Sequence, residues 1–79
     1  MQIEVVKKLI ESGLANSKAN ITGDGSHFQA QVICADFAGK SLLQKQKMVM
    51  ATVTEEIQSG ELHALTIKTH TPDEWALLD

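Results

Sequence analysis

The order of strand-like and helix-like segments constrains the fold of this chain more than any other feature. Around residues 28–35, apolar and polar side chains alternate with a period of two, as in a β-strand with one buried face. A second strand candidate spans residues 62–68, and the residues between the two follow helical spacing. Strands that are joined through helices run parallel, so we expect a mixed α+β domain.

A turn-forming tripeptide separates the first of these strands from another strand candidate. Residues 18–22 have a strand-like composition, and Gly23-Asp24-Gly25 follows them. Because glycine adopts positive φ angles without steric cost, this tripeptide favours a tight turn. Residues 18–35 are therefore predicted to form a β-hairpin. Both faces of its second strand are apolar near residues 32–35, which indicates the central position in the sheet.

Two further segments carry strong helix signals. Residues 2–14 are amphipathic and end in stop signals. After the central strand, Ser41 and Gln44 form a capping-box pattern. The apolar stripe that follows starts with Leu42 and Leu43 and shifts phase between Leu43 and Met48. This pattern predicts a short helix, a tight junction and a longer helix of about 12 residues. Gly60 is the expected C-terminal cap of the second helix.

Another helix signal follows the last strand. Thr71 and Glu74 form a second capping-box pattern, with a proline at the first helical position. We expect this brief helix to fold Trp75 and Leu78 back onto the core. His70, in the loop before it, is expected to be exposed and dispensable.

These elements predict one domain over residues 1–79, a three-stranded mixed sheet with helices packed on one face.

The formal net charge is -3, and all seven cationic side chains are lysines. This balance argues against strong charge-driven nucleic-acid binding, which needs a basic face. A single cysteine, Cys34, excludes an internal disulfide framework, and we expect it to be buried and inert. Since no apolar run approaches the ~20 residues of a membrane helix and no signal-peptide core is visible, we expect a soluble cytoplasmic protein.

Three residue strings, in this order and on these elements, resemble the BolA-like family, in particular its YrbA-type members. The resemblance covers essentially the whole chain, and it implies the family's αββααβ fold, which is similar to a class II KH domain. Many members carry an Arg-His-Arg-like triplet where this chain has Lys45-Gln46-Lys47, so the charge is kept but the forked donors of arginine are lost. The strings are Gly23–Phe28, Phe37–Lys47 and His63–Trp75.

His63 is the residue to which we assign chemistry first. With Leu65 and Ile67 it shares one face at the start of the last strand, where a fixed backbone can hold a ring that still reaches the surface. Neutral imidazole is a good ligand for iron and borderline metals. Spacing alone favours a half-buried histidine that is bonded to a backbone carbonyl. The family resemblance implies instead that His63 is a cluster ligand at the place where a partner docks.

His27, at the head of the second strand, is the second candidate ligand. The family's loop between the first two strands often supplies a Cys or His ligand, and His27 is the only soft donor there. An ordinary surface histidine is the alternative. Two protein ligands cannot complete an iron–sulfur cluster, which needs four. The resemblance implies that a monothiol glutaredoxin of the Cys-Gly-Phe-Ser type is the partner, and that its cysteine and a glutathione thiol complete a bridging [2Fe-2S] cluster.

The resemblance thus implies a non-enzymatic protein that acts in iron–sulfur cluster trafficking or in iron and stress sensing. The chain has no nucleophile with a neighbouring base, no HExxH motif and no phosphate-binding glycine loop. The alternative hypothesis is a DNA-binding transcriptional regulator of stress response and morphology, using the KH-like helical pair with Lys40, Lys45 and Lys47. These lysines equally fit a solvated helix face or a docking surface for an acidic partner. A homodimer formed through the exposed docking surface is the third hypothesis.

Overall fold

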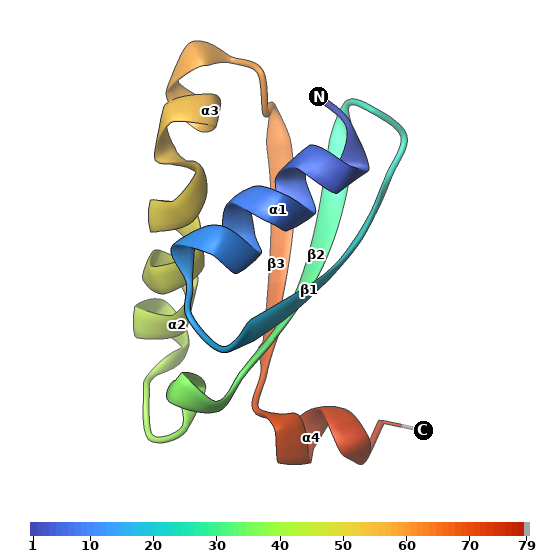
Figure 1. Ribbon diagram of the computed structural model, residues 1–79. Coiled ribbons are helices and arrows are strands. Elements are labelled where there is room, and N and C mark those ends of the chain that lie inside the picture. The colour runs from blue at the N-terminus through green and yellow to red at the C-terminus, as the bar shows by residue number, and fades with distance from the viewer. Residues whose placement is uncertain (79) are drawn as a thin grey trace.

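The computed structural model describes residues 1–78 and contains the predicted three-stranded mixed sheet (Figure 1). The central strand, β2, is antiparallel to β1 and parallel to β3, so the strand order is β1-β2-β3. Figure 1 shows α1 crossing the strands, with α2 and α3 following one another beside β3. The elements are α1 (Ile3–Gly13), β1 (Ser17–Gly23), β2 (His27–Cys34), the 3-10 turn η1 (Ala35–Phe37), α2 (Leu42–Met50), the 3-10 turn η2 (Ala51–Val53), α3 (Thr54–Ser59), β3 (Ala64–His70) and α4 (Pro72–Ala76).

The core lies between one face of the sheet and the helices. In β2, Phe28, Ala30 and Val32 are buried, while Gln29 between them is exposed, as strand alternation requires. The parallel register sets Phe28 beside Leu65 and Ala30 beside Ile67, so both strands turn apolar side chains toward the helices. The helical contribution to the buried cluster comes from Val6, Ile10, Val49 and Val53.

The helical crossover between β2 and β3 is divided differently from the prediction. The longer helix comes first: α2 has nine residues, and α3, after the η2 turn, has six. Leu42 and Leu43, which the sequence reading placed on the buried stripe, are 67% and 64% exposed in the first turn of α2. Val49 is the buried residue of α2, so the change of phase falls at η2. The capping box of Ser41 and Gln44 is present as predicted.

The α4 helix begins as predicted but does not return to the core. Its capping box of Thr71 and Glu74 is formed, with a proline in the first turn. Trp75 is half-buried against His70, whereas Leu78 is 60% exposed, so the expected packing of Leu78 is wrong. A helix of five residues that starts at the end of β3 is too short to reach the helices on the other side of the sheet. None of the helices in residues 1–78 combines the length and the apolar character needed to span a bilayer.

Gly23 is required by space rather than by its backbone angles. A Cβ atom at this position would lie 2.6 Å from the His27 carbonyl oxygen and 2.8 Å from Phe28 Cδ1. We predict that Gly23→Ala lowers the free energy of unfolding by about 1–3 kcal/mol, the usual cost of overpacking. Urea denaturation measures this change, and Ser26→Ala in the same exposed loop is the control. Equal stability of Gly23→Ala and the unmodified protein would contradict the close approach.

Candidate metal-ligand site

His27 is held at the head of β2 by its loop. Asp24 Oδ1 accepts hydrogen bonds from the backbone amides of Ser26 and His27, both at 2.9 Å, and the Asp24 amide donates to the His27 carbonyl at 3.3 Å. Gly25 provides the positive φ of 97° that this turn needs. The backbone of His27 is therefore fixed while its side chain is exposed.

His63 lies on the lead-in to β3 rather than inside the strand. The third strand begins at Ala64, two residues later than predicted, because the Leu62 amide donates to the Glu56 carbonyl at 3.0 Å and closes the end of α3. Gly60 caps α3 with a φ of 86°, as predicted. The side chain of Leu62 is buried and anchors the lead-in, and His63 beside it is exposed. The half-buried alternative for His63 is thereby wrong.

The register of the parallel ladder brings the two histidines to one rim of the sheet. His27 pairs with Ala64, and His63 directly precedes Ala64. Residues two apart on a strand point to the same face of the sheet. By this alternation His27 belongs to the face of the exposed Gln29, whereas His63 belongs to the face of Leu65, which is turned toward the helices. The rim is therefore shared, but the two strand faces are not. A group that both rings bind must lie across the end of the sheet.

The two rim histidines have free rings, in contrast to His70. No hydrogen bond among residues 1–78 uses a ring nitrogen of His27 or His63. Unbound imidazole nitrogen at the surface is the state that a metal ligand needs. The described residues contain no group of three or more His, Cys, Asp or Glu side chains placed to hold a metal ion. A cluster at this rim would therefore take its remaining ligands from outside residues 1–78.

The expectation that His70 is exposed is wrong. It is the last residue of β3, is half-buried, and its Nε2 lies 2.6 Å from Gln31 Oε1. Its ring also packs on Trp75, with a centroid separation of 5.2 Å and an interplanar angle of 55°. His70 thus ties α4 to the sheet. Cys34 is fully buried, as predicted, and its thiol donates to the Ala15 carbonyl oxygen at 3.6 Å.

The three lysines of the alternative hypothesis do not form one surface. Lys40 lies before α2, while Lys45 and Lys47 are two residues apart on the helix, a spacing that directs side chains to different sides. The hydrogen bond from the Thr71 amide first, and more weakly the charge of Lys45, hold the pKa of Glu74 in α4 below its ordinary value. Nucleic-acid binding through these residues stays a prediction, and no arrangement in the structure favours it.

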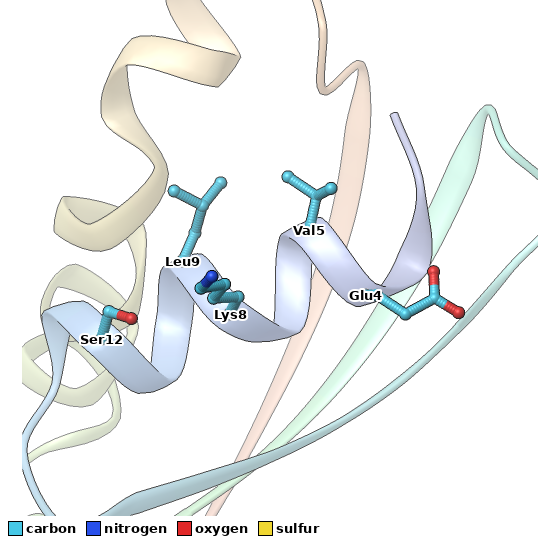
Figure 2. Close-up of a pocket in the computed structure, with 5 residues that line it drawn as sticks. All are labelled: Glu4, Val5, Lys8, Leu9 and Ser12. Carbon is cyan, nitrogen blue, oxygen red and sulfur yellow. The ribbon is translucent and has the colours of Figure 1, made fainter.

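A shallow hollow of about 350 Å³ lies elsewhere, along the outer side of α1 (Figure 2). The hollow is lined mostly by apolar atoms of its five residues, which are Glu4, Val5, Lys8, Leu9 and Ser12. Figure 2 shows Val5 and Leu9 projecting from the same side of the helix. None of the candidate ligands contributes to this hollow, so it is not part of the rim site.

Comparisons with known proteins agree with this architecture. Residues 2–74 match the family of BolA-like proteins. The chain belongs to the BolA-like family. It is 34% identical over 76 residues to the acid stress protein IbaG of Escherichia coli K12, an alignment that covers 96% of this chain and 90% of the relative.

Solved structures of BolA proteins share the fold. A bolA protein homologue from Coxiella burnetii superposes with a TM-score of 0.88 at 38% identity and covers 96% of this chain and 97% of its own. Yeast Fra2 gives a TM-score of 0.69 at 29% identity, with 99% of this chain and 87% of Fra2 covered. Two of these relatives are described as an acid stress protein and a bolA protein homologue.

The loop that holds His27 gives a pH prediction. The amides of His27 and then Ser26 hold the pKa of Asp24 below its ordinary value of 3.8. A carboxyl whose pKa is lowered by folding stabilises the fold above its unfolded pKa, and this contribution is lost as pH falls through the folded pKa. We expect Asp24→Ala to be less stable than the unmodified protein at neutral pH, and the difference to vanish well below pH 3.8. Denaturation curves at both pH values measure it; a pH-independent difference would contradict the assignment.

The contact between β3 and α4 gives a second prediction. His70→Ala removes the partner of Gln31 and the ring beneath Trp75, so we expect a stability loss of about 1 kcal/mol and a red-shifted, more readily quenched Trp75 emission. Trp75 is the only tryptophan, so its fluorescence reports on α4 directly. His63→Ala is the matched control and is expected to leave the emission unchanged.

Proposed function

We propose that this BolA-like protein binds a monothiol glutaredoxin of the Cys-Gly-Phe-Ser type and shares a [2Fe-2S] cluster with it. His63 is the main ligand that this chain contributes, and His27 is the second. The observation that carries the proposal is the pair of exposed, unpartnered imidazoles at one rim of the sheet. The ring of the third histidine, His70, lies at the opposite end of β3 and is already bound to Gln31. Membership of the BolA-like family supports this class of partner.

The donor set fits a cluster that is completed by another molecule. Two imidazoles leave two ligand positions, which the glutaredoxin cysteine and a glutathione thiol would fill. Anchored backbones on both sides of the rim support this role, because Leu62 is buried before His63 and the Asp24 turn fixes His27. A free rim gives the partner access without opening the core.

Imidazole ligands would give the shared cluster two recognisable properties. Replacement of thiolate by imidazole raises the reduction potential, as in Rieske centres. Ligation also requires neutral imidazole, so protons compete with the cluster for the ring nitrogens. Within this proposal the protein transfers a cluster or senses iron and stress, without making or breaking covalent bonds in a substrate. The acid-stress name of the Escherichia coli relative supports a stress-linked role.

Visible absorption and circular dichroism of mixtures with a cluster-loaded monothiol glutaredoxin test the proposal. The unmodified protein is expected to change both spectra at an equimolar ratio, and His63→Ala is expected to abolish the change. His27→Ala should weaken it, because one ligand remains. His70→Ala is the matched control, since it removes an imidazole but leaves both rim residues in place. An unaltered spectrum with the unmodified protein, or an equal change with His63→Ala, would refute the proposal.

A further inference from the structure

The outer edge of β1 is closed at one residue and open on the side toward the turn. The Ala19 amide donates to Glu11 Oε2 at 2.9 Å, and Lys7 Nζ donates to the Ala19 carbonyl at 3.0 Å. Lys7 and Glu11 also form an ion pair at 2.7 Å. One pair of side chains on α1 therefore satisfies both outward-facing backbone groups of Ala19.

The next outward-facing residues along the same edge are not covered. Backbone direction alternates along a strand, so Ile21 and Gly23 turn their amides and carbonyls the same way as Ala19, away from β2. No hydrogen bond among residues 1–78 uses these groups. An edge with free donors and acceptors is a template for another strand.

The sequence of β1 is self-complementary about Ile21. If a second copy pairs antiparallel with Ile21 opposite Ile21, then Lys18 faces Asp24 of the second copy, and Asn20 faces its Thr22. Opposite charges and hydrogen-bonding side chains in directly opposed positions stabilise antiparallel pairs. Asp24 uses Oδ1 for its turn, which leaves Oδ2 for the lysine. Two-fold symmetry repeats each contact.

We propose that the outer edge of β1 is a pairing surface for a second copy of this chain, and that the Lys7–Glu11 pair keeps it closed. In the register centred on Ile21, Ala19 must bond to Gly23 of the second copy through the groups that Glu11 and Lys7 now occupy. The pair therefore competes directly with dimer formation. This inference is independent of the rim site and of any cluster.

The charged groups around Glu11 give the closure a pH dependence. The Lys7 hydrogen bond first and then the Ala19 amide hold the pKa of Glu11 below its ordinary value of 4.5, and the charge of Lys18 acts in the same direction. Lys8 and Glu4 line the same side of α1, and the residues of η2, which packs on α1, are not titratable. Protonation of Glu11 removes the charge that binds Lys7 and weakens the carboxyl group as an acceptor for the Ala19 amide, so the closure is expected to weaken as pH falls through the lowered pKa.

Sedimentation equilibrium of Glu11→Ala at neutral pH tests the proposal without acid. We expect a dimer whose dissociation constant is at least about tenfold lower than that of the unmodified protein, a change of 1.4 kcal/mol. Glu55→Ala, which removes an exposed carboxylate on α3, is the matched control and should behave like the unmodified protein. Circular dichroism checks the fold, and Glu11→Leu, which has no acceptor for the Ala19 amide, replaces Glu11→Ala in the experiment if the alanine variant is unfolded.

A second substitution identifies the surface used. Ile21→Pro removes an outward amide that β1–β2 pairing does not need, and proline is tolerated at such edge positions. Adding it to Glu11→Ala should restore the monomer, and Lys18→Glu should weaken the dimer by placing like charges opposite each other. A Glu11→Ala protein that stays monomeric at millimolar concentration, or a dimer that Ile21→Pro leaves intact, would overturn the proposal.

Discussion

The parallel ladder between β2 and β3 is the constraint on which the rest of the structure depends. A parallel pair cannot be closed by a hairpin, so the chain must cross over, and the crossover supplies Val49 and Val53 to the core. The same ladder sets His27 level with Ala64, which brings the turn after β1 and the lead-in to β3 to one rim. If the register of β2 against β3 shifted by one residue, Phe28 would turn out of the core and His27 would no longer lie level with Ala64. The packing of the core therefore also fixes the candidate site.

Signals that act over a few residues were sufficient to predict much of the fold. The two capping boxes, the αL cap at Gly60 and the turn after β1 depend on hydrogen bonds or φ angles that neighbouring residues determine. The division of the crossover was not predictable in this way. Leu42 and Leu43 have the composition of a buried stripe, but they occupy the first turn of α2, and only the position of the helix on the sheet leaves them exposed.

The three histidines show the same limit for the site. Sequence identifies all three as possible ligands, yet their availability depends on contacts that are distant along the chain. His70 bonds to Gln31, 39 residues away, because β3 extends to residue 70 and sets its ring beside the central strand. His27 and His63 are 36 positions apart in the sequence numbering, and only the strand register brings them to one rim. The directions in which the two side chains point at that rim depend on tertiary structure and cannot be predicted from residue spacing.

Helix side chains also determine how both edges of the sheet meet the solvent. Gln46 of α2 donates to the Ile67 carbonyl at 2.9 Å on the β3 side, and Lys7 with Glu11 covers Ala19 on the β1 side. The open part of the β1 edge ends at the turn in which Asp24 holds the His27 amide. A second copy paired on β1 would place its Lys18 against that same carboxylate. Asp24 Oδ1 is used within the turn and Oδ2 would take the lysine, so pairing at the edge can leave the hydrogen bonds that hold His27 unchanged.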